Sequence, residues 1–184
     1  MRIVAGLHKG RRLAAPSGRI ARPTADRVRQ ALFDILAHTD LVELEGAVVV
    51  DSFAGSGALG LEALSRGAAH ASFLELHPES LAAITDNIKA LKEDGRTKVI
   101  RADAAKPPAA SAPCTLAFLD PPYHSGLVEP CLEGLAAKGW LAKDALVVVE
   151  VAADEDVIAP AGFEAVDRRD RGAAKLVFLV ATGS

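Results

Sequence analysis

The sequence has 184 residues, 50% of them hydrophobic, and a formal net charge of −3. This length and composition favour a single domain with one sizeable core. No window approaches 18 uncharged apolar residues, so we expect neither a transmembrane helix nor a membrane partner. The N-terminal residues, Met1 to Gly6, lack the apolar region and cleavage site of a signal peptide, which favours a cytoplasmic protein.

The charge is distributed unevenly along the chain. Residues 1–30 carry eight Lys/Arg and one acid, whereas the remaining residues carry 13 Lys/Arg against 23 Asp/Glu. The eight basic residues are Arg2, Lys9, Arg11, Arg12, Arg19, Arg22, Arg27 and Arg29. A basic segment on an acidic body is typical of a polyanion-binding surface. The alternative is a solvated terminal tail, which the regular patterning of the segment disfavours.

A small hairpin is predicted at the start of the basic segment. Residues 2–5 and 12–15 are short runs with apolar members, and they flank a glycine-bearing loop at residues 6–10. A Pro/Gly/Arg loop follows at residues 16–23. We therefore expect the first basic side chains to lie on an ordered hairpin.

A helix is predicted after this loop. Thr24 is a suitable N-cap, and Asp26 in the first turn complements the helix dipole. Apolar residues then follow a helical period to about His38. Three arginines cluster near the start of this helix: Arg22, Arg27 and Arg29. Positive charge there is unfavourable for the helix itself, which indicates another use for these side chains.

From residue 46 onward, short apolar runs alternate with helical segments. The predicted strands cover residues 47–51, 71–75, 97–101, 115–119 and 145–151, and the predicted helices cover 57–66, 78–92 and 126–137. This alternation is typical of βαβ units, whose parallel sheet is covered on both faces. Strands at 163–167 and 175–180, joined by a polar loop, form a hairpin that makes the last strand antiparallel. We expect an α/β fold with a seven-stranded, mostly parallel sheet.

A glycine-rich turn follows the first of these strands. Gly55, Gly57 and Gly60 satisfy the G-x-G-x-x-G spacing between a strand and a helix, and Glu75 lies twenty residues after Gly55. This pattern describes a dinucleotide site in which the acid binds a ribose hydroxyl. The spacing alone does not separate NAD from other nucleoside cofactors.

Carboxylates end four consecutive predicted strands. They are Asp51, Glu75, Asp103 and Asp120. The carboxyl ends of parallel strands lie at one edge of the sheet, where open α/β sheets bind ligands. Asp51 would repel a pyrophosphate but favour a cationic group, and Asp103 offers an acceptor for an adenine amine. The set therefore favours a cationic sulfonium nucleoside, S-adenosylmethionine, over an anionic dinucleotide.

The sequence Asp120-Pro121-Pro122-Tyr123 directly follows the apolar run at residues 115–119. Proline has a fixed φ and no N–H, so this segment presents rigid backbone carbonyls that can accept hydrogen bonds. An acid, carbonyl acceptors and an aromatic ring suit a planar substrate that bears an NH₂ group. The alternative is an ordinary turn between a strand and a helix.

The remaining cysteines, histidines and large apolar residues are assigned to structure. Cys114 and Cys131 are isolated in apolar surroundings and are expected to be buried, reduced thiols. No pair of histidines has convincing metal spacing, so we expect no metal; His77 and His124 lie near the strand ends and receive no role. Trp140 is expected in the core. The same holds for a stripe of apolar residues at helical spacing: Leu127, Cys131, Leu132 and Leu135.

These motifs together resemble a known family. Residues 46–182 resemble a class I S-adenosylmethionine-dependent methyltransferase, and the Asp-Pro-Pro-Tyr segment matches the signature of enzymes that methylate planar nitrogens. With the segments at 1–6, 22–29 and 51–57, the likeness covers nearly the whole chain. It is specifically similar to the bacterial small-subunit (16S) ribosomal RNA guanine-N2 methyltransferase family. The resemblance implies a Rossmann-like methyltransferase domain at 46–184, preceded by a basic hairpin and helix extension at 1–45.

The resemblance also implies which residues form the site. The catalytic residues would be Asp120, Pro121, Pro122 and Tyr123. The residues that bind S-adenosylmethionine would be Asp51, Phe53, Ala54, Gly55, Ser56, Gly57, Glu75, Leu76, Asp103, Ala104 and Thr24, with Glu75 on the ribose and Asp103 on the adenine edge. The RNA-binding residues would be Arg2, Lys9, Arg11, Arg12, Arg22 and Arg27.

The implied reaction is methyl transfer to the exocyclic N2 amine of a guanine in 16S ribosomal RNA, on an assembled or assembling small (30S) ribosomal subunit. On the residues alone, other functions stay open. An adenine N6 amine or a protein glutamine amide could meet the same acceptors at Asp120 and Pro121. An NAD-dependent oxidoreductase satisfies the glycine spacing, and a non-catalytic RNA-binding assembly factor could keep the same fold. Only the whole-chain resemblance selects guanine.

Overall fold

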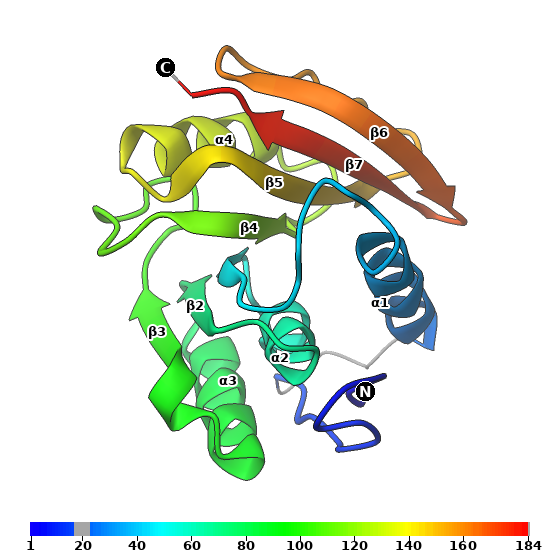
Figure 1. The fold of residues 1–184 in the computed structure, drawn as a ribbon, viewed down its shortest axis with the longest axis vertical. Coiled ribbons are helices and arrows are strands. Elements are labelled where there is room, and N and C mark those ends of the chain that lie inside the picture. Colours follow the sequence, from blue (N-terminus) through cyan, green and yellow to red (C-terminus); the bar gives the residue numbers. More distant parts are fainter. Residues whose placement is uncertain (17–22, 184) are drawn as a thin grey trace.

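The computed structural model describes residues 1–16 and 23–183. These residues form a seven-stranded sheet in the order β3-β2-β1-β4-β5-β7-β6 (Figure 1). The strands are β1 (Val48–Ser52), β2 (His70–Glu75), β3 (Thr97–Arg101), β4 (Cys114–Leu119), β5 (Leu141–Ala152), β6 (Phe163–Arg171) and β7 (Ala174–Ala181). The helices are α1 (Pro23–Leu36), α2 (Ala58–Ser65), α3 (Pro78–Leu91) and α4 (Val128–Ala137), with a 3₁₀ turn η1 at Asp94–Arg96.

The strand directions confirm the predicted α/β sheet. Strands β1 to β5 pair in parallel, and β7 runs antiparallel to both β5 and β6. The chain steps outward from β1 to β3 and then returns to β4 on the other side of β1. Ligands of open α/β sheets bind outside the carboxyl ends of the strands at such a reversal. The residues that directly follow β1, β2 and β4 therefore occupy the expected position of a binding site.

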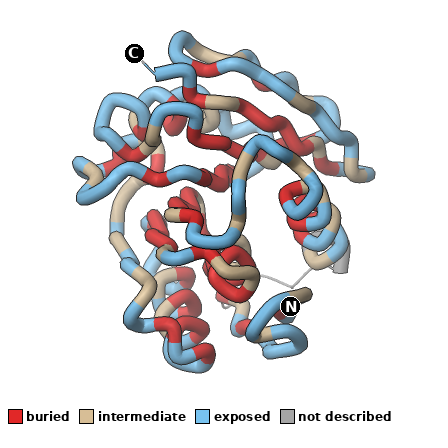
Figure 2. Tube along the Cα trace, viewed as in Figure 1, coloured by how far each residue is buried: buried red, intermediate tan, exposed pale blue. Residues whose placement is uncertain are grey.

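Helices cover both faces of the sheet, and each face has its own core cluster. Val49 and Val50 are successive residues of β1 and belong to different clusters, because successive side chains of a strand point to opposite faces. Phe33 of α1 packs on Phe118 of β4 in the first cluster, with ring centroids 5.6 Å apart. Trp140 lies in the second cluster, beside α4. Figure 2 shows the buried positions concentrated on the central strands and the facing sides of the helices.

The predicted burial of the cysteines is confirmed, and so is that of the helical stripe except for Leu127, which is only partly buried and lies in neither core cluster. Cys114 and Cys131 are free and buried, and burial raises the pKa of each thiol to about 12. Leu132 and Leu135 are fully buried beside Cys131. Neither thiol is therefore a nucleophile at neutral pH. Within the described residues, no helix combines the length and apolar character needed to cross a membrane.

The N-terminal hairpin is confirmed and shares the core of the sheet. Arg2 and Arg12 form an antiparallel bridge, and the Ile3 N–H donates to the Arg11 carbonyl at 2.9 Å. The side chains of Ile3 and Leu13 are buried in the same cluster as residues of α1, α2 and α3. The hairpin is thus packed on the sheet domain, although the division of the chain at residue 45 stays a prediction.

Three predicted boundaries are wrong, the first being the start of β5, which begins at Leu141, four residues before the predicted strand. Helix α1 begins at Pro23, a residue suited to a first turn, so Thr24 lies inside the helix and is not its N-cap. Strand β6 runs to Arg171, whereas a loop was expected from residue 168. Arg168 to Arg171 pair with β7 through the backbone, and this edge strand is exposed over most of its length, so no apolar alternation marks it in the sequence.

Candidate active site

The carboxylates expected at the strand ends gather at one edge of the sheet. Register pairs Ser52 of β1 with Leu74 of β2 and Leu119 of β4, so these neighbouring strands end at nearly the same level. Asp51, Glu75 and Asp120 are close enough that the charges of the last two act on the first. The sequence therefore placed these three acids correctly at the reversal of strand order.

The glycine-rich turn takes a backbone conformation that few other residues adopt. Gly55 and Gly57 have φ values of 59° and 75°, and Phe53 also has a positive φ of 62°. A Cβ atom on Gly60 would lie 2.5 Å from the Phe73 ring, so glycine is required there for α2 to approach β2. The three glycines thus shape a turn that brings backbone N–H groups to the carboxyl edge of β1.

Glu75 builds this turn as well as facing the binding edge. Its Oε2 accepts a hydrogen bond from the Gly55 N–H at 2.8 Å, and its Oε1 accepts from the N–H groups of Leu76 and His77, each at 2.8 Å. A carboxylate offers about four acceptor positions, so one remains on Oε2 for a hydroxyl group. Glu75 is 6% exposed, and such a buried carboxylate is suited to a ribose hydroxyl.

Asp51 provides a test of whether a cationic cofactor fits. Its side chain is buried, and its Oδ2 accepts from the Gly60 N–H at 2.9 Å. Burial raises its pKa well above the usual range, and the negative charges of Asp120 and Glu75 raise it further against the opposing effect of the Gly60 bond. A cationic group beside Asp51 would stabilise the charged form of this carboxylate, whereas a pyrophosphate would add a further repulsion.

The other residues expected at the cofactor differ from Asp51 and Glu75 in how far they are buried. Asp103 is partly exposed, and its Oδ1 accepts from the Ala105 N–H at 2.9 Å, whereas no described residue donates to its second oxygen. Ala54 and Ala104 are buried, Phe53 is half-buried and Leu76 is 48% exposed. Thr24 lies in α1, but its side chain falls outside the described residues, so its assignment stays a prediction.

Asn87 supports the turn from α3 and was missed by the sequence interpretation. Its Nδ2 donates to the Ser56 carbonyl at 2.9 Å and to the Ala14 carbonyl at 3.0 Å, and its Oδ1 accepts from the Ala14 N–H at 2.7 Å. It therefore joins the cofactor turn to the end of the hairpin. A signal exists in the sequence, since Asn87 is a polar residue on the apolar stripe of Ile84, Ile88 and Leu91.

The Asp-Pro-Pro-Tyr segment lies directly beyond β4. Pro121 is buried, whereas Asp120, Pro122 and Tyr123 are exposed. The Pro122 carbonyl accepts from the Ser125 N–H at 3.3 Å, so the turn itself uses one of its two acceptor positions. No hydrogen bond reaches the Pro121 carbonyl within the described residues. The Pro121 carbonyl is therefore a backbone acceptor of this segment to which no described residue donates, and Asp120 lies directly before it.

A further acid, Glu150 near the end of β5, lies beside this segment and was also missed. Register pairs Leu119 with Val149, which sets Asp120 and Glu150 at matching positions. The Tyr123 hydroxyl donates to Glu150 Oε1 at 3.1 Å. Burial raises the pKa of Glu150, and the tyrosine hydrogen bond partly offsets this. In the sequence Glu150 stands between the apolar residues Val149 and Val151 of β5, and only the pairing of β5 with β4 shows its position beside this segment.

The loop after Tyr123 is fastened to the end of β5. Glu155 accepts from the His124 N–H at 2.8 Å and from the Ala152 N–H at 2.9 Å. His124 also faces Asp154, with 3.4 Å between its Nε2 and Asp154 Oδ1. His124 thus has a structural role in this loop. Among the described residues, no group of three or more His, Cys, Asp or Glu side chains is arranged to hold a metal.

Among the described basic residues of the N-terminal segment, all but one are exposed. Five are exposed: Arg2, Lys9, Arg11, Arg12 and Arg27. Arg22 lies outside the described residues, so its assignment to RNA stays a prediction. Arg29 is 4% exposed and pairs with Asp26 at 3.0 Å, so its expected place in a basic surface cluster is wrong. Its guanidinium also donates to the Arg2 carbonyl at 2.5 Å, which gives it a structural role.

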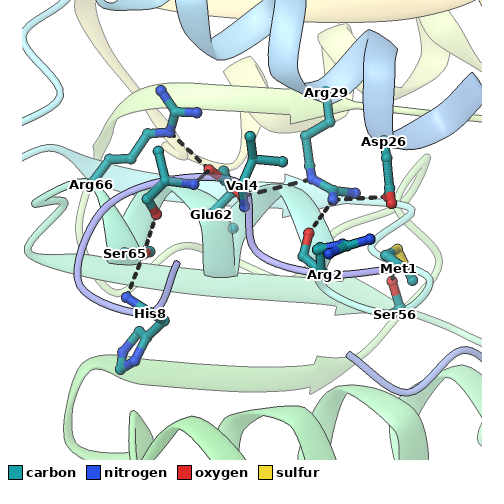
Figure 3. A network of polar contacts seen from close by, with 12 residues as sticks. Met1, Arg2, Val4, His8, Asp26, Arg29, Ser56, Glu62, Ser65 and Arg66 are labelled. Carbon is teal, nitrogen blue, oxygen red and sulfur yellow. Dashed lines mark hydrogen bonds and ion pairs between the residues drawn. The ribbon is translucent and has the colours of Figure 1, made fainter. Parts of the chain in front are cut away.

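Buried Glu62 of α2 fixes the hairpin to the sheet domain (Figure 3). Its two oxygens accept from the N–H groups of Val4 and Ala5 at 2.8 and 3.0 Å. They also face the guanidinium groups of Arg66 at 2.8 Å and of Arg29 at 3.7 Å. These contacts exclude the alternative that residues 1–13 are a solvated tail.

Comparisons with known proteins agree with this geometry. A family model described as "Conserved hypothetical protein 95" matches residues 1–180. The chain is 41% identical to "Ribosomal RNA small subunit methyltransferase D" of Escherichia coli strain K12, over 82% of this chain and 74% of the relative. It is 34% identical to "Putative rRNA methyltransferase YlbH" of Bacillus subtilis, over 82% of each chain. A solved structure of a putative methyltransferase from E. coli superposes with a TM-score of 0.82 at 34% identity, covering 100% of this chain and 99% of that one.

Proposed function

The chain belongs to the conserved hypothetical protein 95 family, and from this membership and the site we propose that it methylates the exocyclic N2 amine of a guanine in small-subunit ribosomal RNA. The names of the curated relatives support a ribosomal RNA methyltransferase. The observation that carries the proposal is the meeting of buried Asp51 with the Asp-Pro-Pro-Tyr segment at one edge of the sheet.

S-adenosylmethionine is the cofactor of the proposed reaction, and the residues of the edge suit it. When bound, it supplies an electrophilic methyl group on a cationic sulfonium. The free acceptor position of Glu75 would take a ribose hydroxyl, and Asp103 would accept from the adenine amine. Asp51 would lie towards the cationic methionine end, where its charge is favoured. The turn from Phe53 to Gly57 would lie against the nucleoside.

The Asp-Pro-Pro-Tyr segment would hold the target amine. The lone pair of an exocyclic guanine amine is delocalised into the ring, so the amine is a poor nucleophile. Acceptors at Asp120 and the Pro121 carbonyl would bind its two hydrogens and draw the nitrogen towards tetrahedral geometry, which localises the lone pair. Alignment of this nitrogen with the methyl group would supply much of the acceleration. The proton leaves after transfer, so no base of raised pKa is required.

The ring of Tyr123 would stack on the base once it has left its own stack. Such stacking contributes about 1–3 kcal/mol per base. The hydrogen bond to Glu150 limits the positions of the Tyr123 hydroxyl, so the ring is oriented before the base arrives. Glu150 is in this account a positioning residue, because it acts through Tyr123.

The substrate is proposed to be a small ribosomal subunit, assembled or assembling, in the cytoplasm. The described residues contain one sheet domain with a hairpin packed on it, so the shape of the RNA or particle would supply much of the specificity. The exposed cations of the hairpin would contact phosphates. Nucleoside mass spectrometry of small-subunit RNA tests the proposal: cells that lack the protein should lose one N2-methylguanosine. An unchanged nucleoside profile would contradict it.

A further inference from the structure

Five exposed cations lie on α3, on β3 and in the loop that follows β3. They are Lys89, Lys92, Lys98, Arg101 and Lys106, and we call them the α3–β3 patch. None of the five forms an ion pair or a side-chain hydrogen bond within the described residues. Residues 86–106 carry six Lys/Arg against four Asp/Glu, although the chain beyond residue 30 is acidic overall. The patch is therefore a local source of uncompensated positive charge.

The opposite end of the sheet is different. Figure 1 shows β3 and β6 at the two ends, and residues 150–175 around β6 carry four Lys/Arg against seven Asp/Glu. The cations there are engaged locally. Arg169 pairs with Asp167 at 2.8 Å, and Lys175 donates to the Glu155 carbonyl at 2.6 Å. Of the two ends of the sheet, the β3 end thus carries the positive charge that has no local partner.

The α3–β3 patch is continuous with the basic hairpin. Arg11 donates to the Ala90 carbonyl near the end of α3 at 2.7 Å. His8 contacts Glu93 at 2.5 Å, and Glu93 in turn binds Arg96 at 2.6 Å. The exposed cations of the hairpin therefore lie directly beside Lys89 and Lys92. At the other extreme of the patch, Arg101 pairs in register with Glu75 and so reaches the active-site edge.

Strand β3 is an uncovered edge of the sheet. Its burial pattern contains no fully buried residue, and Val99 is 36% exposed. The chain from β3 to β4 contains no helix, so Lys98 and Lys106 stand on a surface that no helical crossover covers. Burial and the Lys98 charge lower the pKa of His70 on the neighbouring strand. The positive charge of Lys98 therefore acts on neighbouring groups at this edge of the sheet.

We propose that the α3–β3 patch is a second RNA-contacting surface, which continues the basic face of the hairpin around the β3 edge and leads the RNA to the active site. The inference rests on the proposed function, since a polynucleotide substrate is what an extended, unpaired set of cations suits. Cations at the β6 end lack this role because local partners already neutralise them.

The test uses Lys98 and Lys106, because the other members have a second possible role. Lys89 and Lys92 lie at the C-terminus of α3, where positive charge also favours the helix dipole. Arg101 lies beside Glu75 of the cofactor site. The variant K98Q/K106Q removes two charges from the patch. The matched control, K143Q/R169Q, removes two exposed charges from β5 and β6.

Binding of unmethylated small-subunit RNA, transcribed in vitro, is measured for each protein against salt concentration. In K98Q/K106Q the slope of log affinity against log salt should be shallower by roughly one to two units, with roughly tenfold weaker binding at about 100 mM salt. The control should keep the slope of the unchanged protein. Equal thermal stabilisation of all three proteins by S-adenosylhomocysteine checks that the fold is intact.

An unchanged slope in K98Q/K106Q, or an equal loss in the control, would overturn the second surface. Methyl transfer to small subunits by the unchanged protein is measured in parallel. A normal transfer with an unchanged slope in K98Q/K106Q leaves the proposed function standing and removes only the patch. An absence of transfer with a shallower slope in K98Q/K106Q removes the proposed chemistry and supports the patch as an RNA-binding surface.

Discussion

The hydroxyl of Tyr123 donates a hydrogen bond to Glu150 Oε1 across 3.1 Å, from the loop after β4 to the end of β5. The two residues lie 27 positions apart in the sequence and meet because β4 and β5 pair in parallel. The ring of Tyr123 is 40% exposed, so the bond orients an aromatic face that a base can still reach. Burial raises the pKa of Glu150, and the hydrogen bond from Tyr123 acts in the opposite direction.

Removal of this hydrogen bond should weaken substrate binding without affecting the cofactor. Tyr123→Phe keeps the ring and should raise KM for RNA by roughly three- to tenfold, the loss of one hydrogen bond, with kcat nearly unchanged. Glu150→Leu should have a similar effect, whereas Glu150→Gln keeps an acceptor and should restore most of the loss. Steady-state kinetics of the single and double variants measure this.

The double-variant cycle supplies the control for this prediction. If the two residues act through their bond, Glu150→Leu should have little further effect in the Tyr123→Phe protein. Equal effects of Glu150→Leu in both backgrounds would show that Glu150 does not position Tyr123.

Glu75 should determine cofactor affinity. Glu75→Ala removes the acceptor proposed for the ribose and frees the N–H groups of Gly55, Leu76 and His77, so binding should weaken by about 1–3 kcal/mol. Isothermal titration with S-adenosylhomocysteine measures this, with the exposed Glu79→Ala as a matched control. Stronger binding of NAD than of S-adenosylhomocysteine by the unchanged protein would contradict the cofactor assignment.

The buried charge of Asp51 should lower the free energy of unfolding of the cofactor-free protein and should favour binding of the cofactor. Its folded pKa is raised, so it favours the folded state only when protonated, and this contribution is lost as the pH rises through the raised pKa. Asp51→Asn keeps an acceptor for the Gly60 N–H and should therefore raise the melting temperature at pH 7, with a smaller gain as the pH falls towards about 4. Thermal unfolding over this range measures the trend.

The same Asp51→Asn substitution should weaken binding of S-adenosylmethionine more than binding of S-adenosylhomocysteine, because only the former carries the sulfonium charge. Equal losses for the two ligands would remove Asp51 from the cationic end of the site. A gain in stability that is independent of pH would contradict its raised pKa.

Glu62 should hold the hairpin on the sheet domain. Glu62→Ala removes the acceptor of two backbone N–H groups and the carboxylate that faces Arg29 Nε. Breaking a buried ion pair of this kind typically costs about 3–5 kcal/mol of folding stability. Urea unfolding measures the loss, with the exposed Glu133→Ala of α4 as a control. A loss equal to that of the control would mean that the hairpin docks through its apolar residues alone.

The sheet and most of the site could be predicted from the sequence because their signals are local. The apolar runs of β1 and β4 are buried on both faces, and the glycines and acids follow those runs within a few residues. The strand-end rule then brings Asp51, Glu75 and Asp120 together without knowledge of any long-range contact.

Other features depend on partners far away in the sequence and were missed for that reason. In the sequence, Arg29 is one more basic residue. Its burial depends on Glu62, a partner that lies 33 positions later. Glu150 acquires its role only through the register of β4 and β5. Strand β6 is polar on most of its length, and backbone pairing with β7 defines it where side-chain periodicity does not.

Methyl transfer from labelled S-adenosylmethionine, followed by digestion of the RNA to nucleosides, measures the proposed reaction itself. The enzyme is incubated with small ribosomal subunits or with naked 16S RNA from cells that lack it, and Asp120→Ala serves as the inactive control. We expect label in N2-methylguanosine, more of it from subunits than from naked RNA, and nearly none with Asp120→Ala although that variant still binds the cofactor. Label in N6-methyladenosine, or near-normal transfer by Asp120→Ala, would contradict it.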